Sequence, residues 1–420
     1  MHLRRPYRAF ACLSRAMSAF WWLTLANPRL VGFRLVADAL RRRGIYSEIC
    51  NLPVAIGNWR AVIAPGEFRT LVALRAKQGE FMAINAVDDM EHVRTLQSLL
   101  ELEAAGMAPA KQFDEIEAAV RKLYKLGRHV IVDASDVVHL AGFGGGPAGA
   151  LGELADRLAY PVDLLDQQEP IPFIPVIRSD TTGHQVAMVG RLCHELGLGG
   201  ALRVRTAKAD RATFERILEQ LRVESPDLDL IIDLQYVPDV TIQLTDRVGA
   251  TIGILGEFGP FRSMSVLSGS VPPALTQTST WEQPRTEERL WESLVRGGVV
   301  EVRLGDYGVV HPLSTTAYAS KHVSMTYTCP DHWLYSRERM GDSGDEARQP
   351  RTENPRASTL RIVCRHLVES DSFSGPDFSW GDHEISEAAD GRGTGLGSTN
   401  KPVAFATSHH LAYLATRTAA

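Results

Sequence analysis

Three apolar runs recur at a constant interval in the middle of the chain. They are FIPVIRSD, ALRVRT and DLIIDLQYV, which begin at Phe173, Ala201 and Asp229, each 28 residues after the last. Each gap holds an amphipathic segment, and a strand, a turn, a helix and a return loop fill such an interval. Short apolar runs that repeat in this way are typical of parallel strands buried on both faces. The spacing therefore predicts an α/β fold with a parallel sheet.

Five more runs extend the alternation on both sides. Residues 113–126 have helical spacing, and Gly127 stands where that helix would end. Eight strands separated by helices match a TIM-type (β/α)8 barrel in count and length, with a doubly wound open sheet as the alternative. The five additional predicted strands are LVALRA (71–76), LQSLLELE (96–103), HVIVDAS (129–135), ATIGILGEF (250–258) and VVEVRLGDYGV (299–309).

The barrel accounts for residues 68–312, with an extension on each side. Residues 1–67 contain no lysine and are predicted to be a poorly structured extension. Their apolar run, 16–26, is shorter than the roughly 20 residues of a spanning helix, and Arg15 interrupts a signal-peptide pattern. Residues 313–420 are predicted to pack on the barrel, and the polar stretch 337–358 to be a mobile linker.

Composition narrows the classes of function. The net charge of -5 and the pI near 6.2 give no strong nucleic-acid signal. The five cysteines are scattered without a CxxC pair, which favours a reducing, cytoplasmic location and argues against a thiolate zinc site. We expect no membrane association, and the sequence implies no particular cofactor or metal.

Charged side chains stand at the ends of the predicted strands, where barrel enzymes assemble their active sites. Acids mixed with Lys and Arg suit acid–base chemistry or a phosphate-bearing substrate. The alternative is a structural network in which the same charges neutralise one another. The candidate catalytic residues are Lys77, Glu101, Asp133, Asp233 and Asp306, and the candidate ligand-binding residues are Arg178, Arg203, Arg205, Tyr307 and His410.

Asp306 carries the most specific prediction. It has the same strand parity as Val302 and Leu304, so an inward-facing strand would present it after two apolar layers. We expect it near the barrel axis, in one network with Lys77 and Asp233.

Other motifs carry weaker signals. Residues 142–149 (GFGGGPAG) contain a G-x-G-x-x-G match that suits a phosphate-binding turn, although the loop is long and Pro147 removes an amide donor. The alternative is a flexible loop at the mouth.

The histidine pair and the FSWGDHEI segment (378–385) each allow two interpretations. His409 and His410 would point to opposite faces of a strand. They are either metal ligands or ordinary hydrogen-bonded histidines. Ser379, Asp382 and His383 include the residue types of a nucleophilic triad but lie in one short stretch. An N-terminal helix cap, with Trp380 packing and Asp382 satisfying backbone amides, suits this segment better.

An ordered set of motifs resembles the beta protein family, which is named after a bacteriophage protein. The resemblance covers about residue 71 to the C-terminus. It implies a bacterial or phage intracellular protein with a barrel-like core and a link to phage–host conflict, and it implies no reaction. The motifs are LRAKQGEF (74–81), LLELE (99–103), IPVIRSD (174–180), LIIDLQYV (230–237), GDYGVVHP (305–312), FSWGDHEI (378–385) and SHHLAYL (408–414).

Three features depart from the family pattern. Ser98 stands where the family tends to have proline, TSHHL lacks an expected Asn before the histidines, and residues 1–67 have no counterpart.

The sequence leaves two hypotheses for the function. One is a protein of phage–host conflict that uses the barrel as a scaffold for a protein partner. The other is a hydrolase that acts on a small anionic, phosphate-bearing substrate at the mouth. The sequence does not decide whether the mouth is catalytic.

Overall fold

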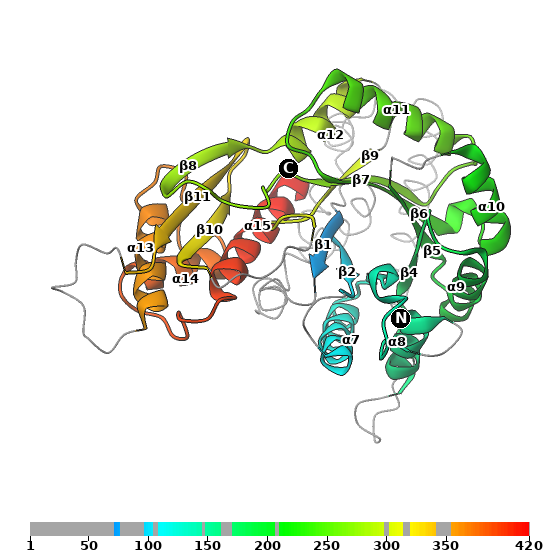
Figure 1. Cartoon of the computed structure of the whole chain (residues 1–420), viewed down its shortest axis with the longest axis horizontal. Helices are drawn as coiled ribbons and strands as arrows, with labels where there is room; N and C mark the ends of the chain where they lie inside the picture. Colours follow the sequence, from blue (N-terminus) through cyan, green and yellow to red (C-terminus); the bar gives the residue numbers. More distant parts are fainter. Residues whose placement is uncertain are drawn as a thin grey trace, which may run out of the picture. The chain divides into compact units, whose positions relative to one another are not determined.

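Eight of the strands that the structure describes close into a parallel barrel (Figure 1). The last strand pairs with the first, because Leu71 and Val72 lie opposite Gly305 and Asp306. The predicted (β/α)8 barrel is therefore confirmed, and the open-sheet alternative is wrong. The strands are β1 (Leu71–Arg75), β2 (Gln97–Glu101), β3 (Ile131–Asp133), β4 (Ile174–Arg178), β5 (Gly200–Arg205), β6 (Leu228–Tyr236), β7 (Ser263–Gly269) and β9 (Val302–Asp306).

The computed structural model describes part of the chain. The predicted extension at 1–67 and the candidate residue Lys77 lie outside that part. The described residues belong to one unit, Phe68–Ala420. They are residues 71–75, 96–103, 108–144, 148–160, 170–205, 210–297, 302–313, 320–341 and 354–419.

Helices alternate with the strands and cover the outside of the barrel (Figure 1). The helix predicted at 113–126 is confirmed as α7, and Gly127 follows it with a φ of 73°. A left-handed residue at this position is a common helix ending, and glycine adopts it without strain. The helices of the barrel are α7 (Pro109–Lys125), α8 (Gly149–Ala159), α9 (Gly183–Leu196), α10 (Arg211–Leu221), α11 (Ile242–Gly256) and α12 (Thr286–Arg296).

The seventh strand differs from the prediction. Residues 250–258 were expected to form it, but they lie in α11 and the turn that follows, and β7 (SMSVLSG) is the barrel strand. Thr241 caps α11, and its buried residues Val248, Thr251 and Leu255 recur at helical spacing. The helical spacing is not visible when the apolar run 250–258 is considered alone. β7 escaped notice because serines interrupt its apolar residues.

The strands bury both of their faces. Leu99 and Ile231 pack inside the barrel, whereas the next residues, Leu100 and Ile232, pack beneath the helices. Successive side chains of a strand point to opposite faces, so this alternation fixes which residues reach the barrel axis.

A smaller α+β part is built from the segments after β7 and β9. Its antiparallel sheet has the strand order β10-β11-β8, and its helices pack against that sheet around a second core (Figure 1). The linker prediction is wrong at both ends, because Arg337–Arg339 lie in β11 and Pro355–Ser358 begin α13. The elements are β8 (Ser279–Pro284), β10 (His322–Thr328), β11 (His332–Arg339), α13 (Pro355–Val368), α14 (Trp380–Ala389) and α15 (Lys401–Ala419).

Helix α15 belongs to both cores. Phe405 packs with the second core, whereas Leu411 and Leu414 pack with the outer core of the barrel. One continuous helix therefore fixes the smaller part against the barrel, and it carries both buried histidines.

The contact between α14 and α15 yields a stability prediction. A Cβ at Gly381 would lie 2.1 Å from the Phe405 carbonyl oxygen, whereas a Cβ at Gly249 in α11 would meet nothing within 4 Å. We expect Gly381→Ala to lower the free energy of unfolding by about 1–3 kcal/mol through overpacking. The control, Gly249→Ala, should raise it by about 0.5–1 kcal/mol. Urea unfolding measures both, and an unaffected Gly381→Ala protein would contradict this packing.

Candidate functional site

The carboxyl ends of the barrel strands bring seven predicted residues to one mouth. Each has the parity of the side chains that fill the barrel interior, and Tyr307 belongs to that interior cluster. All except Arg205 are buried, with at most 5% of the residue exposed. From β2 to β6 they are Glu101, Asp133, Arg178, Arg203, Arg205 and Asp233, and Tyr307 follows β9.

Arg203 lies at the centre of this mouth and is 1% exposed. Its Nη1 lies 2.5 Å from a Glu101 oxygen and 2.6 Å from an Asp133 oxygen. Its Nε and Nη2 lie 3.0 Å and 2.9 Å from Asp233 Oδ2, and Nη2 donates to the Tyr307 hydroxyl at 2.7 Å. A guanidinium has five N–H donors, and four of them make these hydrogen bonds, while Nη2 also makes a 2.9 Å ion-pair contact with Asp233.

Asp233 is equally occupied. Its Oδ2 faces Arg203, and its Oδ1 accepts from the Tyr307 hydroxyl at 2.7 Å and from the Gln235 amide at 2.9 Å. Burial raises the pKa of Tyr307 far above its usual value despite the neighbouring Arg203, so the phenol keeps the proton that it donates. Tyr307 therefore bridges Arg203 and Asp233 as a neutral hydrogen-bonding group.

Asp133 joins the two central arginines. Its Oδ2 accepts from Arg203 and, at 3.0 Å, from Arg178, and its Oδ1 accepts from the Ser135 amide at 2.8 Å. Burial alone would raise the pKa of Asp133, but Arg178 and Arg203 outweigh it and hold the pKa well below the usual range. Arg178 also contacts Asp136 at 2.5 Å. The network therefore extends from β6 to the loop after β3.

Arg205 differs from the other two arginines. Its nearest acid is Asp233, 3.7 Å from Nε, and 37% of its side chain is exposed. That Nε is buried and has no hydrogen-bond partner. The described residues therefore occupy the guanidinium groups of Arg178 and Arg203, and they leave that of Arg205 available at the mouth.

Asp306 does not lie on the inner face of the barrel, where its strand parity predicts it. Val302 packs in the outer core, so the strand faces outward at residues 302, 304 and 306, and Tyr307 points inward instead. Both carboxylate oxygens of Asp306 contact His410 Nε2, at 3.1 Å and 3.2 Å. The predicted placement near the barrel axis beside Asp233 is therefore wrong. Asp306 instead joins β9 to α15.

Burial alone would raise the pKa of Asp306, but His410 and Arg285 outweigh it and lower that pKa. His410 is completed on its other side by Thr328, whose hydroxyl lies 2.9 Å from Nδ1. The candidate ligand-binding residue His410 is 0% exposed, so it lies in the join between the barrel and the smaller part.

The FSWGDHEI segment forms an N-terminal helix cap, as predicted. The side chain that caps α14 belongs to Ser379, and Trp380 packs edge-on against Phe405. His383 is exposed and does not complete a triad. Ser379 Oγ donates to Asp382 Oδ2 at 2.6 Å, and His409 Nδ1 lies 2.9 Å from that oxygen. The serine thus bonds the carboxylate and not the imidazole, which is not the order of a nucleophilic relay.

Sequence reasoning missed a second buried charge cluster, centred on Arg285 just before α12. Arg285 is 0% exposed and contacts Glu287 at 3.0 Å and Glu288 at 2.7 Å. Its guanidinium also lies over the rings of Trp333 and Tyr413, at 4.9 Å and 5.3 Å. No sequence pattern marks it, because the rings come from β11 and α15, far along the chain.

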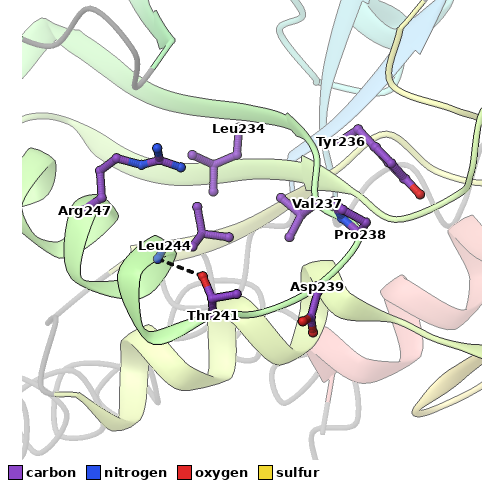
Figure 2. A pocket seen from close by; sticks show the side chains of 8 residues that line it. All are labelled: Leu234, Tyr236, Val237, Pro238, Asp239, Thr241, Leu244 and Arg247. Carbon is purple, nitrogen blue, oxygen red and sulfur yellow. Dashed lines mark hydrogen bonds between the residues drawn. The ribbon is translucent and has the colours of Figure 1, made fainter.

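A small cavity opens beside the carboxyl end of β6 (Figure 2). Its volume is about 240 Å³, and its described lining contains none of the predicted site residues. Thr241, which caps α11, stands at its edge with its hydroxyl bonded to the Leu244 amide (Figure 2). The lining residues are Leu234, Tyr236, Val237, Pro238, Asp239, Thr241, Leu244 and Arg247.

The glycine-rich loop lies partly outside the described residues. Gly142 and Gly144 have φ values of 90° and 84°, which suit glycine, and Gly149 begins α8. Among the residues that the structure describes, no three His, Cys, Asp or Glu side chains are grouped to hold a metal. None of the described helices has the length and apolar character to span a membrane.

The fold and this mouth define a (β/α)8 barrel protein whose carboxyl-end opening contains a buried ion-pair network. A family model described as beta protein matches residues 72–416. The chain therefore belongs to the beta protein family, as its motifs predict.

Other comparisons add little to this assignment. No curated protein matches the chain. Among solved structures, the spore cortex-lytic enzyme SleL of Bacillus megaterium is 9% identical, with 72% of this chain and 68% of that one covered and a TM-score of 0.29. The barrel assignment rests on the strand pairing.

The lowered pKa of Asp133 predicts a response to acid. A depressed carboxyl pKa stabilises the fold above the unfolded value of about 3.9, and this contribution is lost as the pH falls through the folded value. We expect the wild-type free energy of unfolding to fall below about pH 4, and Asp133→Asn to reduce that slope by up to about 1.4 kcal/mol per pH unit. Denaturant unfolding at several pH values measures the slope.

Asp246→Asn, which removes an exposed carboxylate from α11, controls for the substitution itself. If the free energy of unfolding falls equally with pH in Asp133→Asn and the wild type, the ion pairs of Asp133 with Arg178 and Arg203 are contradicted.

Proposed function

We propose that the protein acts in phage–host conflict by binding a protein partner at the mouth of its barrel, with the buried network as a fixed floor. The observation that carries this proposal is the occupancy of Arg203, whose three nitrogens all donate to protein groups, with a further 2.9 Å ion-pair contact to Asp233. A catalytic arginine must direct donors at the substrate, so this arrangement favours a scaffold. The phage–host context is inferred from the family.

Exposed apolar side chains around the mouth support a protein partner. Val138, Leu140, Ile242 and Leu313 are exposed by 38–81%, and they lie on segments that follow the carboxyl ends of β3, β6 and β9. We call these four residues the rim. Exposed apolar side chains that surround a polar centre are a common feature of protein-binding surfaces.

A cytoplasmic location fits the proposal. The described cysteines, Cys193, Cys329 and Cys364, are free and buried. Unpaired cysteines are usual in a reducing compartment, where phage–host conflict takes place.

The second candidate is a hydrolase of a small anionic, phosphate-bearing substrate, and Arg205 is the observation that favours it. In that case Lys77 and Arg203 would hold negative charge, and Glu101 and Asp233 would act as acid and base. Such a hydrolase would turn over a phosphoester such as p-nitrophenyl phosphate, and Asp233→Asn would abolish turnover. The binding proposal expects no turnover by the wild type.

Phage plating tests the binding proposal. We expect the wild-type protein, expressed in a bacterial host, to change the plating efficiency of phages. The double variant Val138→Asp, Leu140→Asp should lose this effect, because each buried apolar contact that it removes is worth about 1.5–3 kcal/mol of partner binding.

Tyr160→Asp is the matched control. Tyr160 is 72% exposed at the end of α8, away from the mouth, so this variant should keep the wild-type effect. A wild-type protein that changes no plating, or a rim variant with undiminished effect at equal expression, would contradict the proposal.

A further inference from the structure

The three arginines of the mouth divide into two kinds. All three nitrogens of Arg203 donate to protein groups, and Arg178 donates to Asp133 at 3.0 Å and to Asp136 at 2.5 Å. Arg205 Nε is buried and has no hydrogen-bond partner, and the nearest carboxylate among the described residues is Asp233, 3.7 Å away. A buried unpaired donor is rare in folded proteins and requires an explanation.

Asp233 cannot supply the missing hydrogen bonds. It is the acid nearest to Arg205, but its oxygens already accept from Arg203, Tyr307 and the Gln235 amide. Because 37% of the Arg205 side chain is exposed while its Nε is buried, we take the terminal Nη groups as the donors that a ligand at the mouth would meet.

A strained bulge lies next to Arg205. In β6, which pairs with β5, the register shifts between Asp233 and Gln235, and Gln235 has a φ of 58°. A non-glycine residue in this region is strained, and such residues cluster at binding sites. Bulges likewise redirect side chains beside functional sites. The bulge is an observation independent of the unpaired Nε, and it marks the same two strand ends.

The charge balance selects the kind of anion. Among the described residues, the ion pairs of the mouth join three arginines to four carboxylates, a formal charge of −1. Those acids would repel a polyphosphate, because the described arginines of the mouth do not outnumber them. A single carboxylate needs only one planar guanidinium, which binds it through two parallel hydrogen bonds.

We infer that Arg205 is the recognition point for a single side-chain carboxylate of the protein partner. This inference rests on the proposed partner binding and specifies the chemistry of that partner. The rim supplies apolar contact around the mouth, and Arg205 supplies the one directional, charged contact inside it.

A labelled acidic peptide tests the inference. The probe is a fluorescein-labelled peptide of serine and glycine with one central glutamate, and its control has glutamine in place of that glutamate. Fluorescence anisotropy should show that the wild type binds the glutamate peptide more tightly than the glutamine peptide. Arg205→Gln should weaken glutamate-peptide binding by about tenfold or more, because charge-assisted pairs are worth about 1.5–3 kcal/mol.

Arg205→Lys keeps the charge but loses the planar pair of donors, so it should bind with intermediate affinity. Arg247→Gln removes an exposed arginine of α11 beside the separate cavity and should bind as the wild type does. Equal melting temperatures would show that each variant is folded.

Three outcomes would overturn the inference: no glutamate-peptide binding, binding unaffected by Arg205→Gln, or inorganic phosphate displacing the peptide more effectively than glutarate at equal ionic strength. The last outcome would favour the hydrolase candidate. If Arg205→Gln binds normally while the rim variant still loses its effect on plating, the carboxylate contact fails and the partner proposal stands. A rim variant that keeps the full wild-type effect on plating removes the partner proposal, whatever Arg205→Gln does.

Discussion

The guanidinium of Arg203 is the interaction on which the barrel mouth depends. It joins the ends of β2, β3 and β6 to Tyr307, the residue after β9. Burying this charge is costly, and its partners repay the cost only when they leave no donor unpaired. The site therefore has one stable arrangement, in which the central residues hold one another. On the proposed function, recognition is left to Arg205 and the rim.

Two consecutive residues connect this floor to the rest of the molecule. Tyr307 faces inward and holds Arg203 and Asp233, whereas Asp306 faces outward and holds His410 of α15. Because strand residues alternate in direction, a shift at the end of β9 would disturb both contacts. The smaller part of the protein is thus fixed to the strand end that completes the mouth, and α15 is part of the structure that positions Tyr307.

Much of the fold could be predicted from the sequence, because buried parallel strands are short apolar runs at regular intervals. β7 was missed because its serines break that pattern. The mouth residues were predictable as strand ends, but their pairing was not: Arg203 meets Glu101 across 102 positions. Asp306 was assigned to the wrong face because parity orders residues along a strand without showing which face is inside. The difference between Arg203 and Arg205 depends on hydrogen bonds that no pattern encodes.

The exchange behaviour of the arginine Nε–H groups tests the central claim most directly. In ¹H–¹⁵N spectra of the labelled protein, slow hydrogen exchange reports a hydrogen-bonded, buried donor. We expect the Arg203 Nε–H to exchange slowly. We also expect four separate Nη–H signals from Arg203, which indicate a guanidinium that does not rotate. Arg205 should show averaged Nη–H signals. If Arg203 also shows averaged Nη–H signals and fast exchange, the mouth is not a saturated floor, and the scaffold account is contradicted.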